Sequence, residues 1–269
     1  MLNNRLTRGM YIKVVPVRRE KSIITVDGAH GKIIDYAIKM KRMQEAKQMH
    51  LMLEKKQVTT QHMKSLAALI RKFHERTDVI DRKFNQAHFS SRFNDIQSVT
   101  EIVREKPGVK QVKIIENAVR FSDHFLENHR KLFHQRVEKG YIRDCHGDLH
   151  ARNIFLYAKP VIFDCLEFND EFRQIDILDE IAFFCMDLEA EGFNTLSKAF
   201  TDYYFSETKN EFGRSEQLLF TYYKCYRANV RAKVNALRAK TSEGEVLEKN
   251  LAEVQKYLAL MNVYMLDLS

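Results

Sequence analysis

The segment that most constrains this chain runs from Cys145 to Asn153, because it places polar residues at fixed intervals between short apolar runs. Asp148 follows His146 by two positions and precedes Asn153 by five, and Asp164 follows Asn153 by eleven. Asp164 directly follows the apolar residues Val-Ile-Phe. An ionised side chain in such a place is costly to bury unless a partner compensates its charge. The spacing therefore indicates a functional site on a loop and on the strand that follows it.

Two carboxylates and one amide at this spacing are the groups required for phosphoryl transfer from magnesium-bound ATP. We assign Asp148 as the base that holds and deprotonates an acceptor hydroxyl. Asn153 and Asp164 are the predicted magnesium ligands, since both offer oxygen atoms to a hard cation. His146 and His150 lie in the same loop and are further candidate catalytic residues. For each residue the alternative is a structural role: a turn cap, a hydrogen bond that locks the loop, or simple support of it.

The motif resembles the aminoglycoside phosphotransferase family, which has the protein-kinase-like fold. The residues that carry the resemblance are His146-Gly147-Asp148-Leu149-His150-x-x-Asn153, Ile162-Phe163-Asp164 and Asp179-Glu180-Ile181-Ala182. Further segments, including Asp35 to Met40 and Tyr226 to Lys233, are similar to an uncharacterised bacterial branch of that family. The resemblance implies ATP and magnesium as cofactors and a small hydroxylated molecule as acceptor. It also implies that His146 organises the loop through backbone hydrogen bonds.

The apolar pattern predicts an α+β chain with antiparallel strands first and helices after them. The resemblance implies a protein-kinase-like chain in two parts, with a partial antiparallel small lobe and hinge over 1–43 and a mainly helical large lobe over 44–269. The predicted strands of the small lobe form an antiparallel meander over 10–17, 22–26 and 33–40. Helices are predicted over 57–77, 94–103 and 109–137, with a break at Pro107-Gly108, and again after Asp176. Short strands flank the motif, over 141–145, 154–157 and 161–164.

The nucleotide side of the site is open to two alignments. A kinase-like site uses a glycine-rich hairpin and a strand lysine, for which Gly28, Gly31 and Lys39 are candidates. If Lys39 had that role, a helix glutamate and two more strands should follow, whereas residues 44–140 have a helical pattern. We therefore favour the alternative, in which Lys39, Met40 and Lys41 belong to the hinge that contacts adenine through its backbone. On this alignment the glycine-rich loop and the phosphate lysine are missing, so the chain is either truncated at its N-terminal side or a naturally short form that binds ATP weakly.

The charge of +8 is divided unevenly along the chain. Residues 1–143 carry +15, residues 144–199 carry −8 and residues 200–269 carry +1. The motif lies in the acidic segment, which should attract metal ions and a cationic or hydroxylated acceptor and repel a nucleic-acid backbone. Arg227, Arg231 and Arg238 share one face of a predicted helix, which raises RNA binding as an alternative. No aromatic platform accompanies them, so we do not favour a nucleic-acid partner.

Composition indicates a globular protein. At 269 residues with 45% hydrophobic content the chain can bury a sizeable core. It has no apolar run of about 20 residues and no apolar signal segment after Met1, so we expect a cytoplasmic protein without a membrane partner. The four cysteines show no CxxC pairing and are expected to be reduced core residues. The oligomeric state and the acceptor stay open, and an inactive pseudo-kinase or interaction module is the alternative to an active enzyme.

Overall fold

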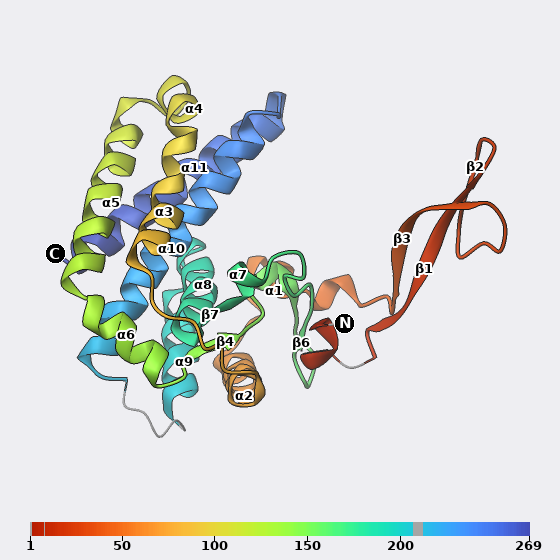
Figure 1. Cartoon of the computed structure of the whole chain (residues 1–269), viewed down its shortest axis with the longest axis horizontal. Helices are drawn as coiled ribbons and strands as arrows, with labels where there is room; N and C mark the ends of the chain where they lie inside the picture. Colours follow the sequence, from red (N-terminus) through yellow and green to blue (C-terminus); the bar gives the residue numbers. More distant parts are fainter. Residues whose placement is uncertain (1, 8, 207–211) are drawn as a thin grey trace.

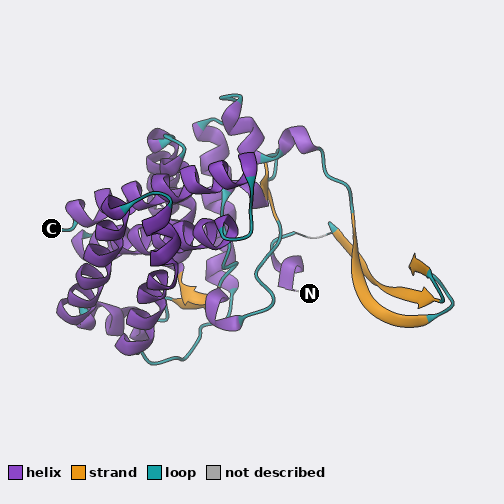
Figure 2. Cartoon of the chain, turned by 90° about the horizontal axis from the view of Figure 1, so that it is seen from above, coloured by secondary structure: helices purple, strands orange, loops and turns teal. Residues whose placement is uncertain are grey.

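The computed structural model describes residues 2–7, 9–206 and 212–269. It consists of a three-stranded sheet that projects from a mainly helical body, and the N-terminus lies near the junction of the two (Figures 1 and 2). The C-terminus lies on the opposite side of the body (Figure 1). The α+β class, with an antiparallel sheet first and helices after it, is confirmed.

The projecting sheet contains β1 (Tyr11–Glu20), β2 (Ile23–Val26) and β3 (Lys32–Met40), close to the predicted ranges. β-Branched residues favour these strands because they pack well on a pleated surface. The order is β2-β1-β3, with both pairings antiparallel, so β1 is central. The prediction of a meander was wrong in this respect, because β3 returns to the free side of β1 instead of pairing with β2.

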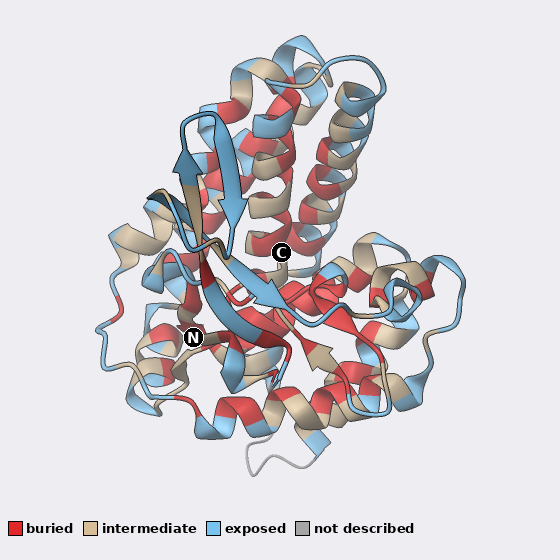
Figure 3. Ribbon diagram, turned by 90° about the vertical axis from the view of Figure 1, so that its right-hand side faces the viewer, coloured by how far each residue is buried: buried red, intermediate tan, exposed pale blue. Residues whose placement is uncertain are grey.

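Both faces of this sheet are largely exposed (Figure 3). Exposed fractions reach 56% for Ile12, 65% for Ile23 and 64% for Tyr36. Tyr11 and Val15 are the buried residues of the three strands. Burial of apolar surface stabilises a protein by about 25 cal/mol for each Å² removed from water, and these exposed side chains lack that contribution. The sheet is therefore a large apolar surface that the described part of the chain does not cover.

The body contains eleven α-helices in the described residues. They are α1 (Met49–Glu54), α2 (Thr60–Arg76), α3 (Gln86–Asn94), α4 (Thr100–Glu105), α5 (Val109–Asn128), α6 (Arg130–Glu138), α7 (Asp170–Arg173), α8 (Ile177–Ala190), α9 (Asn194–Ser206), α10 (Arg214–Ala239) and α11 (Gly244–Asp267). The predicted helix over 109–137 is divided into α5 and α6 at His129, and that over 94–103 is a 3₁₀ turn, η3 (Asp95–Val99), followed by α4. The predicted break at Pro107-Gly108 is confirmed, with Gly108 at a φ of +107°.

Helix α8 lies at the centre of the body and is buried on nearly every side, which fits its almost continuously apolar sequence. It packs against α9 and against α10, which in turn packs along α11. The site depends on this helix, because its first turn carries the charged residues Asp179 and Glu180 into the core. No helix among the described residues is long and apolar enough to cross a membrane.

Two small antiparallel pairs lie between the sheet and the body. Strand β4 (Ile142–Asp144) pairs with β7 (Gln174–Asp176), and β5 (Ile154–Phe155) pairs with β6 (Val161–Ile162). The predicted strands here are present but shorter than expected. All four cysteines are free and buried, as predicted.

Candidate functional site

The loop between β4 and β5 makes a tight bend at Gly147. Gly147 has a φ of +86°, and an added Cβ would lie 3.0 Å from the carbonyl oxygen of Phe172. Both observations require glycine, because other residues rarely adopt this conformation and have no room for a side chain. The bend brings Asp148 out of the core, whereas Leu149 remains buried.

Asp148 is held by two neighbours in the loop. The Asn153 Nδ2 atom donates to the Asp148 carbonyl oxygen at 3.0 Å and to Oδ2 at 3.1 Å. The His150 Nε2 atom lies 3.3 Å from the same Oδ2. Burial raises the pKa of Asp148, but the hydrogen bond and charge of His150, with His146 and Arg231, outweigh it and lower the pKa to about 2. The carboxylate, 38% exposed, is therefore ionised at neutral pH and can accept a hydroxyl hydrogen bond.

His146 connects the loop to the following strand. Its Nε2 atom donates to the carbonyl oxygen of Phe163 at 2.8 Å, and its Nδ1 atom accepts from the Asp148 amide at 3.3 Å. Burial lowers the pKa of His146, against the opposing charge of Glu180. A neutral ring with both nitrogens occupied by backbone groups is suited to holding the loop in position.

Asn153 and Asp164 lie on adjacent segments. The Phe163 amide donates to the Asn153 carbonyl at 3.0 Å, which extends the β5–β6 pairing toward Asp164. Asp164 has a φ of +62°, unusual for a residue other than glycine, and its amide donates to the Tyr11 hydroxyl at 2.9 Å. With the Asn153 nitrogen directed at Asp148, the Asn153 oxygen and the Asp164 carboxylate are the groups suited to a hard cation.

The loop is anchored to α8 by a buried carboxylate whose role the sequence did not reveal. Glu180 Oε1 accepts the amides of His146 and Gly147 at 2.6 and 3.0 Å, and Oε2 accepts His74 Nε2 at 2.6 Å. Burial raises the pKa of Glu180, but the hydrogen bond and charge of His74 lower it to about 2. A second α8 carboxylate, Asp187, accepts the Ala151 amide at 2.8 Å. The sequence signals were the segment Asp179-Glu180-Ile181-Ala182, which forms part of the resemblance, and two acidic residues in the first turn of a mainly apolar helix.

The same buried cluster contains a possible ligand set, since atoms of His74, Cys145 and Glu180 lie within 4.8 Å of one another. Both Glu180 oxygens are already occupied by amide and imidazole donors. Burial also raises the pKa of the Cys145 thiol well above its ordinary value, so this sulfur stays protonated. The chemistry of the set fits a hydrogen-bonded network and not a metal centre.

The first residues of the chain pack against the motif. Arg5, in the short 3₁₀ turn η1 (Leu2–Arg5), donates to the carbonyls of Asp144 and Cys145 at 2.9 and 3.0 Å. Asn3 accepts the Cys165 amide at 2.7 Å and donates to Glu167 at 3.0 Å. Arg5 thus holds the backbone that leads into the loop, and Asn3 holds the segment after Asp164. Sequence reasoning did not assign them, because the partners are more than 130 positions apart.

A cleft of about 1050 Å³ opens in front of the loop, lined by Asp148, His150 and Asp164 on one side. Met40 and Ile38 reach it from the end of β3. The side chains of Lys39 and Lys41 are exposed and lie outside the described lining, and the Lys41 amide donates to the Met10 carbonyl at 2.7 Å. Of the three predicted hinge residues, the structure thus brings Met40 to the cleft.

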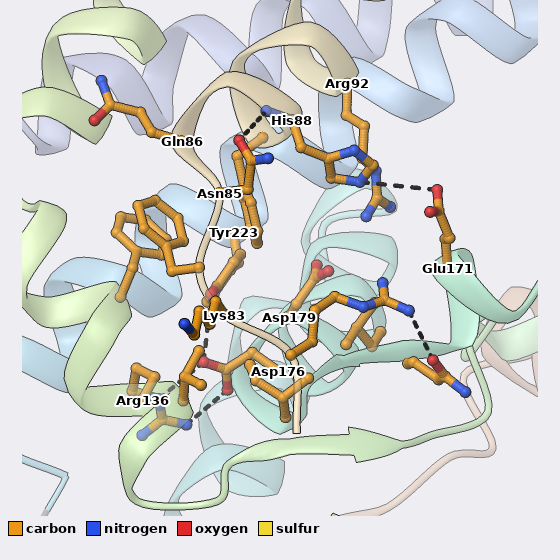
Figure 4. Close-up of a pocket in the computed structure, with 18 of the residues that line it drawn as sticks. Lys83, Asn85, Gln86, His88, Arg92, Arg136, Glu171, Asp176, Asp179 and Tyr223 are labelled. Carbon is orange, nitrogen blue, oxygen red and sulfur yellow. Dashed lines mark hydrogen bonds and ion pairs between the residues drawn. The ribbon is translucent and has the colours of Figure 1, made fainter. Parts of the chain in front are cut away.

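The structure has a second cavity of about 740 Å³ (Figure 4). Its walls include Phe84, Phe133 and the buried carboxylates Asp176 and Asp179. Asp176 caps α8 and forms a two-pronged ion pair with Arg136 at 2.8 and 2.7 Å. The described lining contains none of the predicted catalytic or metal-binding residues. This cavity adjoins the cleft, because Arg92 and Tyr226 line both.

Fold and site together describe an α+β protein with a carboxylate–amide cluster on a loop anchored to a central helix. No family model matches the chain. Uncharacterised proteins of Mycobacterium tuberculosis and Mycobacterium bovis are each 28% identical to it over 241 residues. These matches cover 88% of this chain and 46% of each relative, so the chain spans about half the length of the curated relatives it matches. A solved structure, Plasmodium vivax ethanolamine kinase, matches 85% of this chain and 66% of its own with a TM-score of 0.45 and 11% identity.

Proposed function

We propose that this chain is a kinase-like phosphotransferase that moves the γ-phosphate of ATP to a hydroxyl of a small molecule. The observation that carries the proposal is the ionised Asp148 carboxylate, held by Asn153 and His150 and lining the same cleft as Asp164. The sequence resemblance to the aminoglycoside phosphotransferase family leads to the same assignment. On this proposal residues 1–43 form part of a small lobe and hinge, and residues 44–269 form the large lobe.

Asn153 and Asp164 would hold magnesium in this proposal. An amide oxygen and a carboxylate oxygen on adjacent segments are a suitable donor set for a hard cation. Magnesium, when bound, would neutralise charge on the ATP phosphates. The Tyr11 hydroxyl, bonded to the Asp164 amide, fixes the backbone of that ligand and links it to β1.

Asp148 would bind the acceptor hydroxyl and take up its proton as the new oxygen–phosphorus bond forms. His150 orients the carboxylate from one side and Asn153 from the other. His146 and Glu180 contribute by fixing the loop backbone, which keeps Asp148 in place without touching the reacting atoms. The nucleotide base would lie near Met40, where β3 reaches the cleft.

The exposed sheet supports a second candidate, an interaction module in which β1–β3 binds another protein. Apolar residues on both faces of the sheet favour it, since contiguous exposed apolar surface is typical of protein contacts. In this case the catalytic loop would be retained with weak or no nucleotide binding. Magnesium-dependent binding of ATP distinguishes the two candidates.

The test compares Asp148→Asn with the wild type in ADP release and in calorimetric titration with ATP and magnesium. We expect release to fall by about 10²–10⁴-fold because the base is lost, while nucleotide binding and unfolding are little changed. Asp202→Asn is the matched control, since Asp202 is 60% exposed on α9. Unchanged release by Asp148→Asn would refute the assignment of the base, and no ATP binding by the wild type would favour the interaction module.

A further inference from the structure

The cleft has two walls of opposite charge. The loop side carries Asp148, Asp164 and Glu167, and the facing side is formed mainly by α10. Four α10 residues at helical spacing line it: Arg227, Arg231, Val234 and Arg238. The arginine face that the sequence suggested as an RNA surface is therefore part of the wall of the candidate active site.

Two of the cations near this wall are already neutralised. Arg227 forms a two-pronged pair with Asp179 at 2.6 and 2.9 Å, and both side chains are 6% exposed. Lys233 pairs with Asp95. A ligand in the cleft would gain little from either charge, because each is compensated within the protein.

Three other arginines of the lining, Arg92, Arg231 and Arg238, form no ion pair with any carboxylate of the described residues. The Nε atoms of Arg92 and Arg231 are buried and have no hydrogen-bond partner in the described part of the chain. The Arg92 guanidinium lies 5.2 Å from the centre of the Phe172 ring and that of Arg231 lies 5.4 Å from that of Tyr257. The side chain of Tyr257 and the charges of Asp187 and Asp148 also act on Arg231. None of the three arginines has a carboxylate of the described residues within ion-pair distance, so the parts of their guanidinium groups that line the cleft favour a ligand that supplies acceptors.

The negative charges of the opposite wall are accounted for by the proposed chemistry. Asp148 would take the acceptor hydroxyl and Asp164 the magnesium, which leaves the three arginines as the charges available to the rest of the acceptor. Arg231 and Arg238 are seven residues apart on one helix, which corresponds to about 10 Å along its axis.

We propose that the acceptor is a small hydroxylated anion, with a phosphate or carboxylate bound by Arg92, Arg231 and Arg238 while its hydroxyl faces Asp148. This inference rests on the proposed phosphotransfer. It keeps the hydroxylated acceptor expected from charge along the sequence but replaces the expected positive charge of that acceptor by a negative one. The difference arises because α10, distant in sequence from the acidic segment, forms half of the cleft.

The test uses ligands that differ in charge on a common carbon skeleton. Glucose 6-phosphate, glucose and glucosamine are compared by calorimetry without nucleotide, and gluconate is compared with sorbitol as the carboxylate pair. Each titration is repeated with Arg231→Gln and Arg238→Gln. Arg214→Gln is the matched control, because Arg214 is exposed at the start of the same helix and lies outside the described lining of the cleft.

We expect an anion of the panel to bind at least about tenfold more tightly than its neutral and cationic counterparts, and each cleft variant to weaken it by about 10- to 100-fold. Arg214→Gln should bind it as the wild type does. Equal or tighter binding of glucose, sorbitol or glucosamine, equal losses in all three variants, or no binding of either anion at millimolar concentration would overturn the proposal.

ADP release with magnesium and ATP is measured separately on the same ligands. If ADP release depends on the acceptor, and Arg238→Gln raises the KM for the acceptor but leaves the KM for ATP unchanged, the result supports a contact between Arg238 and the acceptor. A change in the ATP KM alone would overturn it, because the arginine would then serve the nucleotide. Tight anion binding without any ADP release would instead refute the phosphotransfer on which the acceptor assignment rests.

Discussion

The buried carboxylate of Glu180 offers the sharpest test of how the loop is held in place. It is 1% exposed and accepts three hydrogen bonds, from the amides of His146 and Gly147 and from His74. Replacement by glutamine keeps the size but removes the charge, and it places an NH₂ group where one of the donors needs an acceptor. All three bonds therefore lose their charged acceptor, and the bond to His74 is kept only if the imidazole accepts at Nε2 and donates from Nδ1 to the Tyr204 hydroxyl.

The magnitude follows from these contacts. A hydrogen bond to a charged group contributes about 1.5–3 kcal/mol, and a buried donor left without a partner costs about 1–3 kcal/mol. Removing one partner of a buried pair typically costs about 3–5 kcal/mol in total. We expect Glu180→Gln to lower the free energy of unfolding by that amount. We also expect slower ADP release, because the backbone before Asp148 is then no longer fixed.

The assay is urea unfolding followed by far-UV circular dichroism, since the chain has no tryptophan. Because the pKa of Glu180 is about 2 in the folded chain and its ordinary value is 4.5, the stabilisation is complete above pH 4.5 and is lost as the pH falls toward 2. The glutamine variant should lack this acid dependence. Glu191→Gln is the control: its pair with Lys256 is 52% exposed on the glutamate side and should contribute at most about 1 kcal/mol. A loss below about 1 kcal/mol in Glu180→Gln would refute the reasoning.

Two further predictions concern buried groups near the site. Arg227→Met leaves Asp179 as a buried carboxylate without its ion-pair partner and should lower the free energy of unfolding by about 3–5 kcal/mol. Adding Asp179→Asn should restore most of this loss. If the losses of the two single variants simply add in the double variant, the prediction is contradicted. Burial lowers the pKa of His146 in the folded chain. As the pH falls through about 6.5, this histidine is therefore protonated in the unfolded chain before it is protonated in the folded chain, which favours unfolding. The free energy of unfolding of the wild type should decrease more steeply in this pH range than that of His146→Gln. His30→Gln, in an exposed turn, is the control, and equal pH slopes in all three proteins would contradict the prediction.

Local sequence patterns were sufficient to predict most helices and strands, because the period of apolar residues and the helix-breaking residues act over a few positions. The sheet order was not predictable in the same way. The segments of β1, β2 and β3 are compatible with a meander, and the choice of β1 as the central strand depends on how β3 returns. The exposure of both sheet faces was also missed, since alternation and β-branched residues predict a strand but not what covers it.

The proximity of the loop and the strand that precedes Asp164 could be predicted because it follows from short spacings in the sequence. The groups that hold the loop could not. Glu180 reaches the amides of His146 and Gly147 across more than 30 positions, and Arg5 reaches the loop across 139. Such pairings depend on packing of the whole body, and nothing in the local sequence identifies them. For the same reason the local sequence indicated only negative charge around the motif. The positive charge of the cleft comes from Arg231 and Arg238 of α10, which are distant from the motif in sequence.

The two halves of the cleft differ in how firmly they are held, and this bears on how the proposed reaction is organised. Asp148 lies on a loop that buried carboxylates fix to α8, and His146 and Asn153 join this loop to Phe163. The Asp164 amide is bonded to the Tyr11 hydroxyl, at the point where the sheet joins the body. A displacement of β1 therefore reaches Asp164 directly and Asp148 through the bonds that His146 and Asn153 make to Phe163. Binding to the exposed sheet would then affect nucleotide and magnesium affinity more than proton transfer at Asp148.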